Sequence, residues 1–278
     1  MKVSCSAYYG YLIGKSYLKS QKEAETAEKV KLIFFDNRRR YGTRRISFEL
    51  KSEAENVGRY RVRRLMKEQG LKAIYPKRFV PKTTTPDNNR ASPNLLETAE
   101  NKPSNPKSVI IGDITYLPLS NGKFAYLSSF QDKFTRRVVG WKVSERMTED
   151  IVIESLQQGI ERGFINKKAI IHTDRGSQYS SRNFRKLLKR NKLRQSMSGK
   201  GNCYDNAQAE SFFARYKIEL LEGGYFEDVN HARSETFSYI EGYYNRKRRH
   251  SGIGNQSPND FEKAWEKQGS DFNHFGVR

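Results

Sequence analysis

The chain has 278 residues and a mass of 32.4 kDa, enough for one large domain or for a core with smaller modules. Hydrophobic residues make up 36% of it, and 52 Lys and Arg against 31 Asp and Glu give a net charge of +21. A charge of that sign attracts polyanions, which makes nucleic acid the first partner to consider. Two cysteines and four histidines offer neither a disulfide framework nor zinc-ligand spacing. With no bilayer-length apolar run and no secretory signal, we expect a cytoplasmic protein without a membrane partner.

The first part of the chain is the more basic one, with 24 Lys and Arg against 11 Asp and Glu up to residue 107. Residues 27–75 show helical periodicity, with Val30, Ile33 and Phe34 at i, i+3 and i+4. We therefore expect residues 1–75 to form a helical, helix-turn-helix-like DNA-binding module. The solvated face of an ordinary amphipathic helix is the alternative explanation for its charges. The DNA contacts predicted in this module are Arg44, Arg45, Arg63 and Arg64.

Residues 76–107 are rich in Pro, Ser, Thr and Asn and show no period, which predicts a linker. Beyond them, runs of β-branched and apolar residues at 108–117, 124–131 and 137–143 predict three strands, with gaps short enough for an antiparallel meander. Helical patterns and one more apolar run follow, so the order of elements predicts an α/β domain. These are a helix at 149–162, a short buried strand at 169–172, and helices at 181–191 and 205–221.

Three carboxylates stand where an α/β domain can present functional groups. Asp113 lies inside an apolar strand, where a charge needs a cation, a partner or a solvent-filled cleft. Asp174 follows the strand at 169–172, and Glu210 lies on the helix at 205–221. Together these acids can hold a pair of Mg²⁺ ions for phosphodiester chemistry, because Mg²⁺ prefers hard oxygen ligands. Each acid alone is better explained as a cap, a surface group or an ion-pair partner, so the prediction depends on all three.

Four motifs surround these acids: 111–116 (IGDITY), 132–141 (DKFTRRVVGW), 172–179 (HTDRGSQY) and 196–207 (SMSGKGNCYDNA). With Glu210 and the residues after it, they resemble the catalytic subunit, OrfB, of the insertion-sequence-three family of bacterial transposases. That family is similar to retroviral integrases in its core. The 35 residues between Asp174 and Glu210 are the spacing typical of the superfamily.

The resemblance implies an RNase H-like, integrase-type catalytic core over 108–265 with basic C-terminal helices, followed by a tail at 266–278. It implies that Asp113, Asp174 and Glu210 are the catalytic acids and the ligands of two Mg²⁺ ions, for which Mn²⁺ can substitute. The activity that follows is cleavage and strand transfer of insertion-sequence ends in DNA transposition.

Two lysines near these acids are predicted to contact DNA. Lys217 lies seven residues after Glu210, close to two helical turns, so both can face the same side of one helix. Its ammonium can then contact a phosphate of the DNA end. Lys200 lies in the Gly-rich segment 198–202, whose backbone amides can also hold phosphate, although an ordinary turn is the alternative explanation.

A basic cluster near the C-terminus follows two aromatic residues. Residues 246–250 (RKRRH) follow Tyr243 and Tyr244, with one Asn between them. Cations next to aromatic rings suit phosphates and splayed bases, and a solvated helix end is the alternative. The DNA contacts predicted here are Arg246, Lys247 and Arg249.

The resemblance also implies partners. We expect double-stranded DNA, both terminal inverted repeats and target; a homodimer or higher oligomer, because two ends are synapsed; and an upstream helix-turn-helix subunit, OrfA, which relatives fuse by frameshifting. The protein is expected in the bacterial cytoplasm, associated with the nucleoid. Residues 3–9 resemble a motif that lies further inside many relatives, as if the start were truncated. A catalytically idle DNA-binding regulator derived from a transposase and an RNase H-like nuclease that cuts without joining stay open as alternatives.

Overall fold

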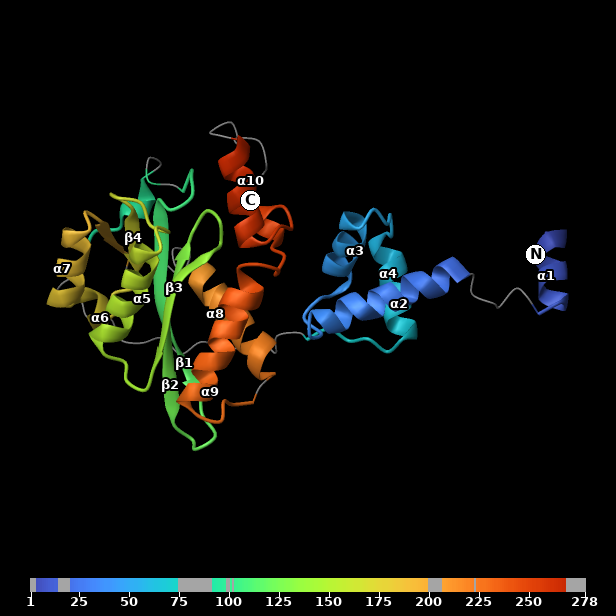
Figure 1. Cartoon of the computed structure of the whole chain (residues 1–278), viewed down its shortest axis with the longest axis horizontal. Coiled ribbons are helices and arrows are strands. Elements are labelled where there is room, and N and C mark those ends of the chain that lie inside the picture. Colours follow the sequence, from blue (N-terminus) through green and yellow to red (C-terminus); the bar gives the residue numbers. More distant parts are fainter. Residues whose placement is uncertain are drawn as a thin grey trace. The chain divides into compact units, whose positions relative to one another are not determined.

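The computed structural model of the chain describes residues 4–14, 21–74, 92–98, 101, 103–199, 207–222 and 224–268. The chain divides into two compact units, Met1–Tyr75 and Pro76–Arg278 (Figure 1). Among the helices within the described ranges, none has the length and apolarity that a membrane crossing needs.

The first unit is helical, as predicted. Val30, Ile33 and Phe34, the residues that carry the periodic pattern, are all buried, and α2, α3 and α4 pack on one another around them. The turn between the last two helices is held by Ser47, whose hydroxyl donates to the Val57 carbonyl at 2.7 Å. The helices are α1 (Cys5–Leu12), α2 (Gln21–Asp36), α3 (Thr43–Ser52) and α4 (Arg59–Glu68).

The second unit is built on a five-stranded sheet with the order β3-β2-β1-β4-β5. The first three strands form the predicted antiparallel meander, and β4 and β5 continue the sheet in parallel with β1. The sequence analysis missed β5, since its residues RQSM contain no apolar run. The strands are β1 (Val109–Pro118), β2 (Phe124–Asp132), β3 (Val138–Ser144), β4 (Ile170–Thr173) and β5 (Arg194–Met197).

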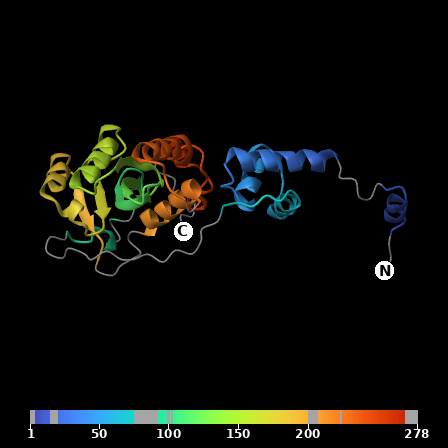
Figure 2. The same cartoon turned by 90° about the horizontal axis from the view of Figure 1, so that it is seen from below.

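Helices cover both faces of this sheet (Figures 1 and 2). Helix α5 packs closely on β3 because Gly140 has no side chain there; a Cβ on it would lie 2.0 Å from the carbonyl oxygen of Ser155. One face carries α5 (Glu149–Glu161), α6 (Ser177–Ser180) and α7 (Arg182–Arg190). The other carries α8 (Ala207–Leu221), α9 (Val229–Phe237) and the π-helical turn η5 (Ser238–Tyr244).

Part of the segment predicted as a linker belongs to the edge of the core. The short helix η3 (Leu95–Glu97) lies beside β5, where the Leu95 N–H donates to Ser196 Oγ at 2.9 Å. Ser92 Oγ is 2.9 Å from Oε1 of Gln195. Ser92 and the backbone of Leu95 are thus hydrogen-bond partners of the edge strand, so residues 92–98 are not a free linker.

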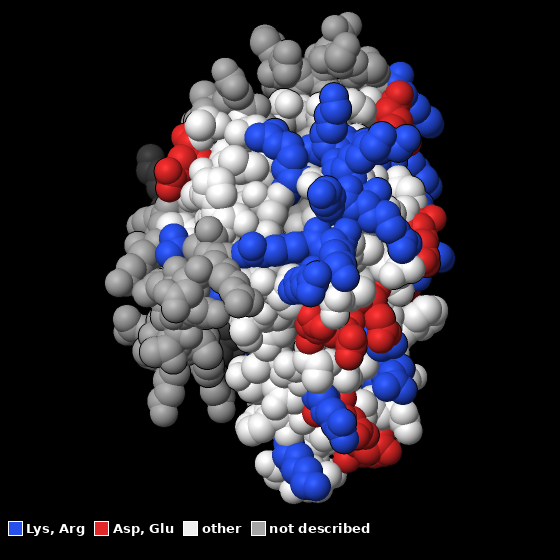
Figure 3. Space-filling view, turned by 90° about the vertical axis from the view of Figure 1, so that its left-hand side faces the viewer, with Lys and Arg blue, Asp and Glu red and all other residues white. Residues whose placement is uncertain are grey.

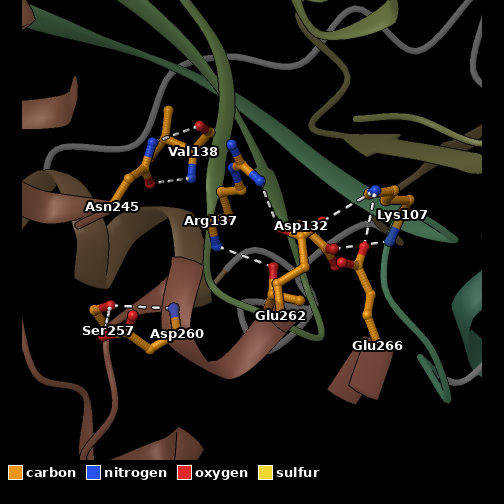
Figure 4. Close-up of polar contacts among 10 residues, drawn as sticks. Lys107, Asp132, Arg137, Val138, Asn245, Ser257, Asp260, Glu262 and Glu266 are labelled. Carbon is orange, nitrogen blue, oxygen red and sulfur yellow. Dashed lines mark hydrogen bonds and ion pairs between the residues drawn. The ribbon is translucent and has the colours of Figure 1, made fainter. Parts of the chain in front are cut away.

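The C-terminal segment is fastened to the same core by polar contacts (Figure 4). The Asn245 side chain pairs with the backbone of Val138: Oδ1 accepts from the N–H at 3.0 Å and Nδ2 donates to the carbonyl at 2.9 Å. Glu262 bridges Arg137 at 2.5 Å and Lys107 at 3.2 Å. These contacts anchor the chain before and after η6 (Ser251–Ile253), and α10 (Pro258–Gln268) carries Glu262.

Candidate active site

Two of the predicted acids come from neighbouring parallel strands. In the pairing of β1 with β4, Ile111 lies opposite His172. Asp113 lies two residues after Ile111 on β1, and Asp174 lies two residues after His172, one residue beyond the end of β4. The same register, continued by one residue, brings both acids to one level and one face of the sheet. The strand pairing thus brings Asp113 and Asp174 together, although 61 positions separate them in the sequence.

Both carboxylates accept hydrogen bonds from nearby backbone. Asp113 Oδ1 accepts from the N–H of Ile114 at 2.8 Å, and Asp174 Oδ1 accepts from the N–H of Gly176 at 3.0 Å. Burial raises the pKa of Asp174, and the hydrogen bond from Gly176 acts in the opposite direction. An anion in this position is therefore costly without a cation beside it.

Tyr179 is a core residue within electrostatic reach of both acids. It is 1% exposed, and burial, followed by the charges of Asp113 and Asp174, raises its pKa well above the ordinary value. Its phenol stays neutral next to the aspartates, and its ring packs edge-on against Phe184 with centroids 5.6 Å apart. Tyr179 thus links the acidic pair to the apolar core beneath α7. Sequence reasoning did not single it out.

Helix α8 brings a cation toward the aspartates. Lys217 is half-buried; burial lowers its pKa, and the carboxylate of Asp113 acts in the opposite direction. Glu210 lies two turns earlier on the same side of α8, with an exposed side chain. In the portion of the chain that the structure describes, no three His, Cys, Asp or Glu side chains are close enough to hold one metal ion. The structure therefore joins Asp113 and Asp174 but does not bring Glu210 into contact with them.

The start of α8 is anchored by amide side chains. Gln208 Nε2 donates to Gln131 Oε1 at 2.8 Å and to the Asp132 carbonyl at 3.2 Å, while Gln131 Nε2 donates to the Tyr244 hydroxyl at 2.7 Å. These contacts hold the helical turn that carries Glu210. Sequence reasoning missed these contacts. The one available signal was Gln131, a polar residue near the end of the apolar strand β2.

The other end of α8 is held by a buried ion pair. Glu219 and Arg248 are 7% and 3% exposed, and Arg248 Nη2 lies 2.7 Å from Glu219 Oε1. Tyr239 donates a further hydrogen bond to Glu219 at 2.9 Å. Sequence reasoning placed neither charge in the core, because a charged residue type alone gives no sign of burial.

The C-terminal basic cluster differs from its predicted role. Tyr243 and Tyr244 are 9% and 3% exposed, and the Tyr244 ring packs edge-on against Phe212 at 4.9 Å between centroids. The expectation that these rings stack on splayed bases is therefore wrong, since they belong to the core. Of the predicted cations, Arg246 and Lys247 are exposed, and the half-buried Arg249 donates to the Asn255 carbonyl at 3.0 Å.

The arginines predicted to bind DNA in the helical module also differ in exposure and in their contacts within the protein. Arg44 and Arg63 are exposed. Arg45 donates to the Arg40 carbonyl at 3.3 Å and lies over the Tyr41 ring at 5.3 Å. Arg64 forms ion pairs with Glu23 and Glu68. Lys200 lies outside the described residues.

Comparisons with known proteins identify the family. Residues 20–79 match the HTH-like domain, and residues 103–203 and 191–258 match two Integrase core domain families. The chain is 38% identical over 246 residues to the transposase for insertion sequence element IS904 of Lactococcus lactis, which covers 88% of this chain and 96% of the relative. It is 36% identical over 264 residues to transposase InsF for insertion sequence IS3A of Escherichia coli, covering 94% and 91%. The chain belongs to this family of insertion-sequence transposases.

The predicted fold class is thereby confirmed: the transposase has an integrase-type α/β core and an HTH-like helical domain. A solved simian T-cell lymphotropic virus intasome is also similar, at 15% identity and a TM-score of 0.46, covering 84% of this chain and 74% of that one.

Proposed function

We propose that this transposase cuts insertion-sequence ends and joins them to target DNA, with Asp113, Asp174 and Glu210 as its catalytic acids. The observation that carries the proposal is the parallel register that sets Asp113 beside Asp174 in an integrase core. The relatives named as transposases, similar over nearly their whole length, support the same reaction.

The donor set fits divalent Mg²⁺. Carboxylate oxygens are its preferred protein ligands, and the raised pKa of the buried Asp174 means that a cation beside it would be favourable. Asp113 and Asp174 would hold the metal jointly, with Glu210 as the third ligand that the resemblance implies. Two bound Mg²⁺ ions, or Mn²⁺ in their place, would activate the attacking oxygen and stabilise the leaving oxygen of the phosphodiester.

The residues around the acids have defined tasks in this proposal. Tyr179 adds no charge near the two aspartates, because its buried phenol stays neutral. Lys217 offsets the charge of Asp113 and contacts a phosphate of the DNA end. Lys200 contributes a phosphate contact from the neighbouring segment.

Further DNA contacts would come from exposed cations in both units. Arg44 and Arg63 are the strongest in the helical module because their side chains are exposed. Arg45 and Arg64 would have to exchange their contacts within the protein for a phosphate. Near the C-terminus, Arg246, Lys247 and Arg249 would contact DNA phosphates. The neighbouring tyrosines would take no part, because they are buried.

The assignment of segments and partners follows from the same proposal. Residues 1–75 would bind DNA, 108–265 would carry catalysis, and 266–278 would be a tail. The substrates would be double-stranded DNA with terminal inverted repeats and target DNA, held by a homodimer or higher oligomer in the bacterial nucleoid. An OrfA-type helix-turn-helix subunit would supply much of the end-sequence specificity.

Substitution of the acids tests the chemistry. Asp113→Asn, Asp174→Asn and Glu210→Gln should each reduce Mg²⁺-dependent nicking and joining of a labelled terminal-repeat duplex by at least about a thousandfold, because the metal ligands are lost. DNA affinity should be retained. Glu145→Gln, an exposed carboxylate in the loop after β3, is the matched control and should keep full activity.

The outcomes separate the alternatives. Activity retained in Asp174→Asn would refute the acidic triad. A wild type that nicks but never joins would be a nuclease, and one that binds DNA without any cleavage would be the idle regulator.

A further inference from the structure

A dense group of cations covers the outer face of α7 (Figure 3). The helix has the sequence RNFRKLLKR, in which five of nine residues are basic and none is acidic. Phe184, Leu187 and Leu188 are buried in the core of the second unit, so the charges gather on the opposite side of the helix. Acidic side chains lie beside this group and not within it (Figure 3).

The cations continue from the helix onto two neighbouring turns. The Lys168 N–H donates to the Lys192 carbonyl at 2.9 Å, and the Arg194 N–H donates to the Ala169 carbonyl at 2.9 Å. The turns that precede β4 and β5 therefore lie side by side next to the end of α7. We define the α7 patch as six exposed residues: Lys168, Arg182, Lys186, Lys189, Arg190 and Lys192.

The cations of the α7 patch differ from the paired cations elsewhere in this unit. None of the six side chains forms an ion pair with an acidic residue within the described ranges. Arg182 and Lys186, like Lys186 and Arg190, are like charges four residues apart, an arrangement that destabilises a helix by roughly 0.2–0.5 kcal/mol. Lys189 and Arg190 lie in the last turn, where cations suit the helix dipole, whereas Arg182 and Lys186 have no such compensation.

Two of the lysines also occupy an unfavourable backbone conformation. Lys168 and Lys192 have φ values of 66° and 56°, in the left-handed region where Gly costs least. Glycine would therefore be the less costly residue at both positions, so the two lysines can be replaced without strain.

The patch is separate from the proposed catalytic site. Strand β4 runs from the turn at Lys168 toward Asp174, so the patch begins at the opposite end of this strand. Asp113 faces α8, as its interaction with Lys217 indicates, whereas α7 covers the other face of the sheet. A duplex on the patch would therefore contact a different surface from the one that holds the reacting phosphate.

We propose that the α7 patch is a second DNA-contact surface, which holds duplex DNA through its phosphates without reading the base sequence. The proposal rests on the proposed function only in taking DNA as the substrate. From Arg182 to Lys189 the helix rises about 10 Å, a length over which a duplex presents roughly six phosphate charges. Long cationic side chains suit contact with the phosphate backbone. The one exposed amide of the helix, Asn183, donates to Glu149 at 2.6 Å.

Paired charge removals in the full-length protein test this surface. The first variant is Lys186→Gln/Lys189→Gln, and the control is Lys263→Gln/Lys267→Gln, which removes the same charge from exposed positions of α10. Affinity for a fluorescent duplex of random sequence should fall on the order of tenfold in the first variant at low salt, and its salt dependence should weaken by about one phosphate contact per lysine. The control should bind like the wild type.

A second variant removes charge while easing the backbone. Lys168→Gly/Lys192→Gly suits the left-handed φ values, so it should leave the thermal midpoint unchanged or raised and still weaken duplex binding. A loss of affinity there cannot be attributed to unfolding.

The results have clear meanings. Equal weakening on random and terminal-repeat duplexes supports the proposal. Affinities indistinguishable from the control would overturn it, as would a loss confined to the terminal repeat, which would show sequence reading. Failure of the acid substitutions to abolish cleavage would refute the proposed function and leave this result untouched.

Discussion

The two faces of the sheet are held to their helices by different means. On the apolar face, formed with α5, α6 and α7, the contacts are made by buried side chains such as Ile110, Phe130 and Leu156. On the polar face, formed with α8, α9 and η5, buried amide groups join the sheet to the helices, as Gln131 does with Gln208. The ion pair of Glu219 and Arg248 joins α8 to the segment that follows η5.

The difference matters for function because the proposed catalytic groups belong to the polar face. Apolar packing is not directional, although it fixes how closely two layers approach. Hydrogen bonds and ion pairs specify both distance and angle. The contacts of Gln208 and Glu219 hold the two ends of α8, and with them the helix that carries Glu210 and Lys217.

Removal of the buried ion pair on the polar face should have the largest effect on stability. Arg248→Met leaves Glu219 buried without its cation and should cost about 3–5 kcal/mol of the free energy of unfolding. The double variant Glu219→Gln/Arg248→Met should recover much of this loss. Both Trp residues, Trp141 and Trp265, lie in the second unit, so their fluorescence during denaturation reports on this unit alone.

The matched control for that experiment is Arg246→Met. This arginine is exposed two residues earlier in the same basic run, so its loss should change the midpoint little. Equal effects of the Arg246 and Arg248 substitutions would contradict the distinction between the two faces.

The apolar face should respond to a single added methyl group. Gly140→Ala places a Cβ 2.0 Å from the carbonyl oxygen of Ser155, so α5 must move away from β3, at a cost of about 3 kcal/mol. Gly242→Ala, in η5 with nothing within 4 Å of the new atom, should be neutral or slightly stabilising. Thermal unfolding followed by Trp fluorescence distinguishes the two, and a harmless Gly140→Ala would disprove the close packing.

The smallest expected effect concerns Asp132, at the edge of the polar face. Burial raises its pKa to about 6 from the ordinary 3.8, although backbone N–H groups of Lys107 and Phe134 donate to it at 2.8 Å. The folded protein therefore keeps the proton at pH values where the unfolded chain has lost it. The contribution of Asp132 to the free energy of unfolding is fully present below about pH 4. It falls by up to about 3 kcal/mol as the pH rises through 6.

Comparison with Asp132→Asn isolates that titration. The stability of the wild type relative to this variant should decline between pH 4.5 and 6.5, measured by denaturant unfolding. The exposed Glu145→Gln should show a constant difference over the same range. A constant difference for Asp132→Asn would mean that its carboxylate titrates normally.

The sequence by itself determined the elements and the acids. Periodicity within contiguous residues predicted the helices of the first unit, the meander and α5, because a helix or strand buries one face at a fixed repeat. Asp113 could be named as a candidate because it interrupts an apolar run, and Asp174 because it follows one. Glu210 could be named from the pattern of the helix at 205–221. The family resemblance implied the shared catalytic role of the three acids and the integrase-type core.

Only the tertiary structure decided which polar groups lie inside. Arg248 and Arg246 belong to one basic run, yet one is buried and the other exposed. Arg248 finds its anion 29 positions away, and Gln208 meets Gln131 across 77. The α7 patch likewise joins a helix to turns that precede two separate strands. Burial of a charge depends on partners brought together by the whole fold, and a local pattern carries no information about them.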